Sequence, residues 1–172
     1  MMIGMQSGTL VSVEEYLNTS YSPDCEYVEG RILERNLGEF DHSRLQINLG
    51  SYLRVREKEW GILAVTEQRV QVKTDRFRVP DICVLAGGRP SEQIFIRPPL
   101  LCIEILSKED RMSDVLLKVD EYLAFGVRYV WILDPRTRRA QIYDPGGVHE
   151  VKDGMLWTSD PEILVPLDQL FD

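Results

Sequence analysis

The sequence predicts an α+β fold of the mixed α/β kind, in which helices flank a central mixed β-sheet and an N-terminal helix and hairpin precede it. Three observations predict it. Short alternating or apolar segments, which are typical of strands, surround two long segments with helical periodicity. Residues 100–133 read as strand, helix and strand, which predicts two parallel strands joined by a right-handed crossover. The length of 172 residues suits one domain over residues 1–172.

The composition is that of a globular protein. Hydrophobic residues make up 44% of the chain and charged residues 28%. The net charge of −8 argues against bulk attraction to nucleic acid or anionic lipid, but it leaves room for a site where Mg²⁺ supplies the positive charge. The three cysteines are scattered in apolar segments, which favours a reducing compartment. Residues 1–5 lack the features of a signal peptide and no apolar window reaches about 18 residues, so we expect a cytoplasmic protein with no membrane partner.

The first third of the chain predicts a helix, a hairpin and a longer helix. Ser12 and Glu15 have the spacing of a capping box, which marks a helix start. The pair Glu29-Gly30 reads as a tight turn between two strands, and Asp41 can cap the longer helix. The expected elements are a helix over residues 13–17, strands over residues 25–28 and 31–34, and a helix over residues 42–59.

The remainder of the chain is β-rich and contains one more long helix. Thr74-Asp75-Arg76 reads as a turn between two strands that should pair as an antiparallel hairpin. Gly126 is placed to end the last long helix. We expect strands over residues 63–72, 77–85, 100–106, 129–133 and 138–143, a helix over residues 110–125, and a tail of turns and short apolar pieces with a final helical turn at residues 167–171.

Two carboxylates interrupt segments that otherwise read as core. Asp81 follows Pro80 on an expected strand, and Glu104 lies in the middle of a strand that is apolar on both faces. Burying an ionised carboxylate in such a strand costs a free energy on the order of several kcal/mol, unless the carboxylate is paired or binds a metal. Because adjacent strands lie about 4.8 Å apart, Asp81 and Glu104 can converge on one Mg²⁺, with the backbone carbonyl of Ile105 as a neutral ligand.

A lysine on the crossover helix completes the constellation. Asp114, Lys118 and Tyr122 share one helix face at i, i+4 spacing. Lys118 could orient or deprotonate a metal-bound water, or neutralise charge in the transition state. Other interpretations exist for the same residues: Asp81 could cap a turn, Lys118 could pair with Asp114 in solvent, and Tyr122 could be a core residue.

A joint pattern runs along nearly the whole chain. It comprises Pro80-Asp81, Glu104-Ile105-Leu106-Ser107, Asp110-Arg111, the spaced Asp114, Lys118 and Tyr122, Gly126-Val127, Tyr129-Val130-Trp131-Ile132-Leu133-Asp134-Pro135, and further matches at Glu26-Tyr27-Val28-Glu29-Gly30, His42 and residues 159–171. This pattern resembles the Uma2 family, a branch of the PD-(D/E)XK nuclease superfamily.

The resemblance implies a restriction-endonuclease-like core and a Mg²⁺-dependent phosphodiesterase site, with Mn²⁺ as a substitute. By motif, Asp81 corresponds to the acid of PD and Glu104 to the first acid of (D/E)XK. The lysine of that motif would fall at Leu106, where it is absent, and Lys118 matches the displaced position on the following helix. Glu26 matches the N-terminal acid of the family and is assigned a catalytic role.

His42 matches the usual histidine of the family, although a lone histidine at a helix start is more often a capping or solvated residue. The leading hypothesis for the whole chain is an endonuclease that hydrolyses DNA phosphodiester bonds. The alternatives are a non-catalytic interaction or regulatory module with a nuclease fold, and a metal phosphoesterase for small nucleotides. A homodimer is a further hypothesis, because many relatives of this fold cut both DNA strands as pairs.

Overall fold

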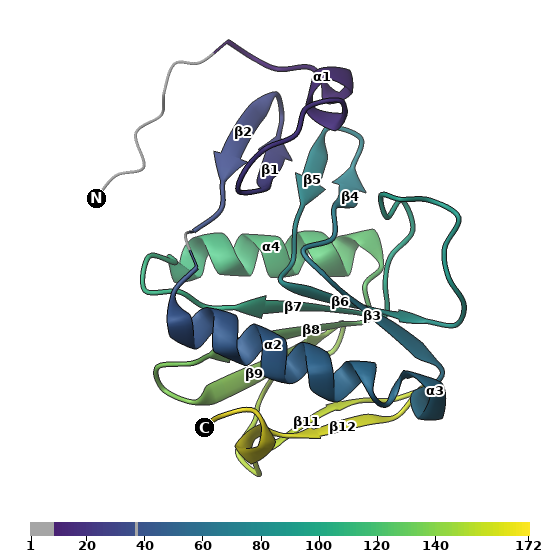
Figure 1. Cartoon of the computed structure of the whole chain (residues 1–172), viewed down its shortest axis with the longest axis vertical. Coiled ribbons are helices and arrows are strands. Elements are labelled where there is room, and N and C mark those ends of the chain that lie inside the picture. Colours follow the sequence, from purple (N-terminus) through teal and green to yellow (C-terminus); the bar gives the residue numbers. More distant parts are fainter. Residues whose placement is uncertain (1–8, 37) are drawn as a thin grey trace.

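The computed structural model describes residues 9–36 and 38–172, in which strands form three sheets and helices flank the largest one (Figure 1). The predicted absence of a signal peptide concerns residues outside these ranges. The four-stranded sheet has the order β2 (Arg31–Glu34), β1 (Cys25–Val28), β5 (Arg76–Arg78), β4 (Val70–Lys73). The six-stranded sheet has the order β10 (Gly147–Glu150), β9 (Arg139–Asp144), β8 (Tyr129–Asp134), β7 (Leu101–Ile105), β6 (Ile82–Ala86), β3 (Ile62–Thr66), and β11 (Met155–Thr158) pairs with β12 (Ile163–Pro166).

Helices cover the two faces of the six-stranded sheet, which confirms the predicted mixed α+β architecture. Of the helices, α2 (Phe40–Arg54) and α4 (Met112–Phe125) lie on these faces, whereas α1 (Val13–Leu17) packs against the four-stranded sheet. The remaining helices, α3 (Glu57–Trp60) and the 3-10 turn η1 (Leu167–Gln169), are short. One core packs α2 and the β11–β12 hairpin against one face of the sheet, and a second core packs α4 against the other face. The four-stranded sheet lies beyond α4, so α4 is sandwiched between the two larger sheets (Figure 1).

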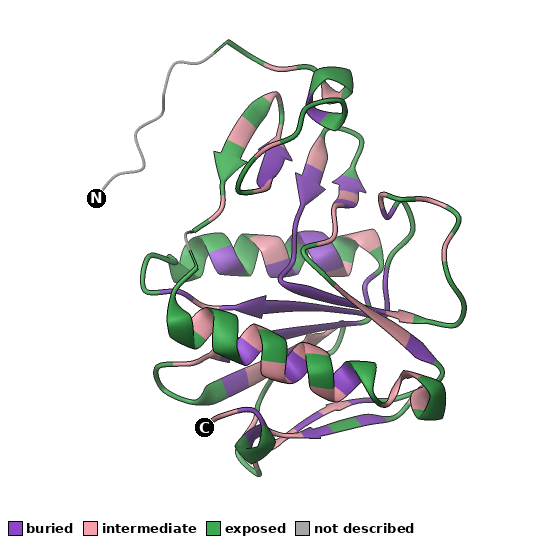
Figure 2. Ribbon diagram, in the orientation of Figure 1, coloured by how far each residue is buried: buried purple, intermediate pink, exposed green. Residues whose placement is uncertain are grey.

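The predicted crossover is present and places Glu104. Strand β7 is parallel to β8, with Glu104 opposite Ile132, and α4 connects the two strands. The helix ends as predicted at Gly126, whose φ of 111° is readily adopted only by glycine. Both central strands are buried along almost their whole length, as Figure 2 shows. Glu104 therefore projects into a core and not into solvent.

The two long strands expected at residues 63–72 and 77–85 each break into two. Their halves still pair antiparallel, but β4 and β5 belong to the four-stranded sheet, whereas β3 and β6 belong to the six-stranded one. Pro80 cannot donate a ladder hydrogen bond, and Glu67 has a φ of 50°, so neither chain can continue as a regular strand. Asp81 was expected within a strand, and instead lies at this junction directly before β6.

Other boundaries also differ from the prediction. The helix expected over residues 42–59 begins at Phe40 and stops at Arg54, and α3 follows as a separate turn. Asp41 therefore lies in the first turn of the helix and not at the N-cap. Its carboxylate still interacts favourably with the helix dipole from that position. The apolar pieces of the tail form three strands, of which β11 and β12 close the core beneath α2.

One buried and one exposed isoleucine can be used to test how much the core contributes to the free energy of unfolding. Ile103 in β7 is fully buried, whereas the side chain of Ile96 is 52% exposed. We expect Ile103→Ala to lower the free energy of unfolding by about 2–5 kcal/mol, because it removes apolar contacts and leaves a cavity. The matched change Ile96→Ala should cost less than about 0.5 kcal/mol. Urea unfolding followed by circular dichroism measures both, and equal losses would contradict the assigned core.

Candidate active site

The four side chains to which the sequence assigns a catalytic role lie together, although they come from separate parts of the fold. Glu26 lies on β1, Asp81 before β6, Glu104 in β7 and Lys118 on α4. The carboxylates are buried, with exposed fractions of 3% for Glu26 and Asp81 and 8% for Glu104. The crossing of β1, β6 and β7 over α4 brings three acids and one lysine into a single buried cluster.

Asp81 is held by donors on both carboxylate oxygens. Its Oδ2 accepts the backbone N–H of Ile105 at 2.7 Å, and its Oδ1 accepts a guanidinium N–H of Arg35 at 2.8 Å. His42 Nε2 lies 3.3 Å from the same Oδ1, so this histidine faces the site and is not a solvated helix residue. The hydrogen bond with Asp81 raises the pKa of His42 although burial opposes it. The backbone carbonyl of Asp81 also accepts a hydrogen bond from Gln46 at 3.1 Å.

Glu104 is short of positive charge. Its Oε1 accepts the hydroxyl of Tyr122 at 2.7 Å, in a setting where both residues are buried. Burial is the largest influence on the pKa of Glu104; Lys118 lowers this pKa, Asp81 and Glu26 raise it, and it comes to about 7. The expectation that Tyr122 is a core residue is confirmed, since its side chain is fully buried, but its hydroxyl also orients a carboxylate of the site.

Lys118 pairs with Glu26 and not with Asp114. Its ammonium lies 3.1 Å from Glu26 Oε1, and the lysine side chain is only 24% exposed. Burial would lower the pKa of Lys118, but Glu104 and Glu26 outweigh it and raise the pKa above its ordinary value. Lys118 is therefore a cation in this arrangement, which favours electrostatic stabilisation over proton abstraction.

A buried ionic ladder that the sequence did not predict supports Glu26. Arg78 is 4% exposed and Glu121 is 5% exposed. An Arg78 guanidinium N–H lies 2.9 Å from Glu26 Oε2, while its Nε lies 2.6 Å from Glu121 Oε2. Arg76 donates to Glu121 as well. Burial would raise the pKa of Glu26, but Lys118 and Arg78 hold it below its ordinary value, so Glu26 stays ionised. The signal that could have found Arg78 is a charge between two apolar residues in a strand, two positions before Pro80.

The donor set around Asp81 and Glu104 fits a hard divalent cation. The Asp81 carboxylate is near enough to Glu104 for its charge to raise the pKa of Glu104, and the N–H of Ile105 points at Asp81. In an extended strand the carbonyl of a residue points to the same side as its N–H, so Ile105 also offers an oxygen there. Within residues 9–36 and 38–172, no three His, Cys, Asp or Glu side chains form a ready-made metal cage. A Mg²⁺ ion, which keeps several waters, suits two carboxylates and one carbonyl.

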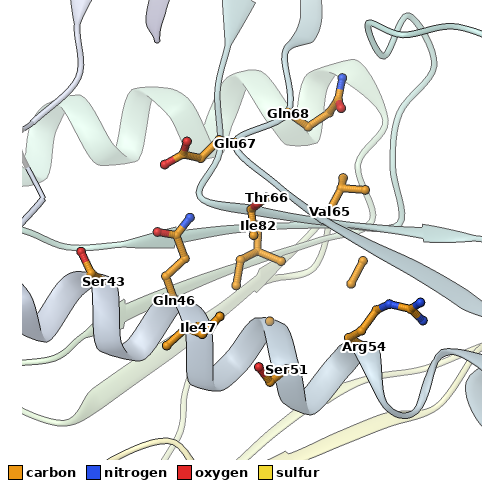
Figure 3. A pocket seen from close by; sticks show the side chains of 12 residues that line it. Ser43, Gln46, Ile47, Ser51, Arg54, Val65, Thr66, Glu67, Gln68 and Ile82 are labelled. Carbon is orange, nitrogen blue, oxygen red and sulfur yellow. The ribbon is translucent and has the colours of Figure 1, made fainter. Parts of the chain in front are cut away.

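An open groove lies beside the junction that carries Asp81; its lining includes Ile82 but none of the four side chains of the cluster. It has a volume of about 830 Å³ and runs between α2 and the edge strand β3 (Figure 3). Ser43, Gln46 and Ser51 line it from α2, and Glu67 lines it just beyond β3. Since Gln46 and the N–H of Glu67 both bond the carbonyl of Asp81, the groove ends at the junction that carries Asp81.

A mixed sheet with helices on both faces and buried acids at a strand junction is the arrangement of the restriction-endonuclease-like class of proteins. The chain belongs to the Uma2 family: the family model described as "Putative restriction endonuclease" matches residues 13–167. Among solved structures, the chain is similar to a "putative nuclease belonging to DUF820" from Anabaena variabilis, with 24% sequence identity and a TM-score of 0.80. The match covers 94% of this chain and 97% of that one. No curated protein matches the chain.

The raised pKa of Glu104 predicts that this acid destabilises the metal-free protein. The pKa is about 7 in the folded chain and has an ordinary value of 4.5, so the cost of ionising Glu104 grows between these pH values and is complete above pH 7. We expect Glu104→Gln, which keeps an acceptor for Tyr122, to raise the free energy of unfolding at pH 8 by about 1–3 kcal/mol and to change it little at pH 4.5. Urea unfolding in EDTA at both pH values measures the difference. A variant that is less stable than wild type at pH 8 would contradict this account, and the exposed Glu162→Gln is the control.

The ionic ladder predicts the opposite sign for a neighbouring acid on α4. Glu121→Gln leaves Arg78 and Arg76 without their shared carboxylate in a buried setting, so we expect a loss of about 2–3 kcal/mol in the free energy of unfolding. Asp120→Asn makes the equivalent change at the adjacent exposed position and should cost less than about 0.5 kcal/mol. Thermal unfolding at pH 7 compares the two variants. Equal losses of stability in Glu121→Gln and Asp120→Asn would refute the role of the ladder.

Proposed function

We propose that this protein is a metal-dependent endonuclease that hydrolyses DNA phosphodiester bonds at the junction of β6 and β7. The observation that carries the proposal is the shortage of positive charge at Glu104, which lies buried beside Asp81 and Glu26. Membership in the Uma2 family supports a nuclease-like function for this site. In the proposal, Asp81, Glu104 and the carbonyl of Ile105 hold Mg²⁺, or Mn²⁺ in its place.

A bound divalent cation supplies Lewis acidity and a water of lowered pKa. In the reaction, the oxygen of a water adds to phosphorus and one P–O ester bond breaks; the protons of that water pass to solvent and to the leaving oxygen. Tyr122 keeps the Glu104 carboxylate oriented, and the N–H of Ile105 does the same for Asp81. Lys118, held by Glu26, presents its ammonium to the negative charge that develops on the phosphoryl oxygens.

The proposal extends to the cellular compartment and the oligomeric state of the protein. Cys25, Cys83 and Cys102 are free and buried, which suits the reducing cytoplasm. No helix in the described part of the chain is long and apolar enough to cross a membrane. Cleavage of both DNA strands would be served by two copies of the site, so we propose a homodimer. Sedimentation that finds only a 19.9 kDa species would remove the dimer and leave the site proposal intact.

Cleavage of supercoiled plasmid DNA tests the function. With Mg²⁺ or Mn²⁺, wild-type protein should nick or linearise the plasmid, and EDTA should abolish the reaction. We expect Asp81→Asn and Glu104→Gln each to lower the rate by about 100-fold or more, and Lys118→Met by about 10- to 100-fold, because each removes a group needed in the transition state. Glu162→Gln, an exposed acid, is the control.

The same experiment separates the alternative functions. Equal rates in wild type, Asp81→Asn and Glu104→Gln would reject the assignment and leave a non-catalytic interaction or regulatory module. Hydrolysis of a small nucleotide without any cleavage of DNA would instead identify a metal phosphoesterase for nucleotides.

A further inference from the structure

Arg35 provides a positive charge beside the buried carboxylate of Asp81. Its guanidinium donates to Asp81 Oδ1 at 2.8 Å, and Asp81 is the first ligand in the proposed metal set. Arg35 lies in the connection that follows β2 and its side chain is 15% exposed, so it is enclosed but not locked in the core. The side chain of the other arginine of the cluster, Arg78, is only 5% exposed and pairs with two carboxylates.

Arg35 also has a second partner that points outward. A guanidinium nitrogen of Arg35 lies 3.5 Å from Glu67 Oε1, and the Glu67 side chain is 53% exposed. Glu67 is one of the residues that line the groove between α2 and β3 (Figure 3). The guanidinium therefore bridges one buried acid and one half-exposed acid, and a small movement would leave it on Glu67 alone.

We propose that Arg35 is an exchangeable counter-ion of Asp81: it neutralises this carboxylate when no divalent cation is bound, and it transfers to Glu67 when one binds. The inference rests on the proposed metal site. A divalent charge interacts with a carboxylate more strongly than a monovalent one at a similar distance, so the exchange favours the metal once Arg35 has an alternative partner. The transfer also brings a bidentate donor of the kind that recognises phosphate to a residue that lines the groove.

The exchange makes Arg35 a competitor of the metal, and this can be measured without any substrate. Calorimetric titration with Mn²⁺ should show tighter binding by Arg35→Met than by wild type, by about fivefold or more. Met keeps the unbranched stem and removes the charge. Arg44→Gln removes the same charge from an exposed pair with Asp172 and should change the affinity by less than about twofold.

A double-mutant cycle distinguishes exchange from simple repulsion. Glu67→Gln removes the alternative partner and should weaken Mn²⁺ binding by about threefold in the wild-type background, but should have a much smaller effect when Arg35→Met is also present. Equal effects of Glu67→Gln in both backgrounds would overturn the exchange. Because Glu67 is half-exposed, this variant does not threaten the fold, and circular dichroism checks Arg35→Met.

Failure of the exchange and failure of the metal site give different results. If wild type binds Mn²⁺ and Arg35→Met binds it equally or more weakly, Arg35 is not a competitor, while the metal site stands. If neither protein binds Mn²⁺, the metal site fails and the exchange with it. Binding that is detectable only in Arg35→Met would show that Arg35 blocks the site permanently, and would overturn the exchange.

Discussion

The structure depends on the burial of several carboxylates in one place. Glu26, Asp81 and Glu104 would repel one another in a medium of low dielectric, and each has lost most of its hydration. The fold compensates them unequally. Glu26 has Lys118 and Arg78, Asp81 has Arg35 and His42, and Glu104 has the hydroxyl of Tyr122 without an ion pair of its own among the described contacts. The pKa of Glu104, raised to about 7, expresses this inequality.

The backbone makes this concentration of charge possible. Two antiparallel segments of the chain, β3–β4 and β5–β6, run side by side from one sheet to the other. Asp81 lies where the second segment passes from the four-stranded to the six-stranded sheet. Because Pro80 ends the ladder there, the Asp81 carboxylate can turn toward the end of β7 and accept the N–H of Ile105. Regular pairing through Asp81 would have directed its backbone, and not its side chain, at that strand. The irregular junction is therefore what positions the acid.

The sequence predicted the fold class and the crossover that carries Glu104 and Lys118, because burial patterns and helical spacing are local signals. Glu26, in contrast, was assigned only through the resemblance to the family. It did not predict the switch between sheets, since the strands on both sides of Pro80 read as one continuous segment. It also missed Arg35, Arg78 and Glu121. Their partners lie 43 to 52 positions away in the Arg78 ladder and 46 positions away for Arg35, and no local pattern encodes such pairs.

The two arginines of the cluster differ in a way that follows from their surroundings. Arg78 lies between two carboxylates in the core. Removing either carboxylate would leave the buried guanidinium without part of its compensating charge, so Arg78 is held in place. Arg35 lies between a buried acid and a half-exposed one, so it can leave Asp81 without losing all compensation. A site built only of fixed ion pairs would have no vacancy for a metal. In the proposed exchange, one uncompensated acid and one arginine with a second partner give the site room for a divalent cation that fixed ion pairs would exclude.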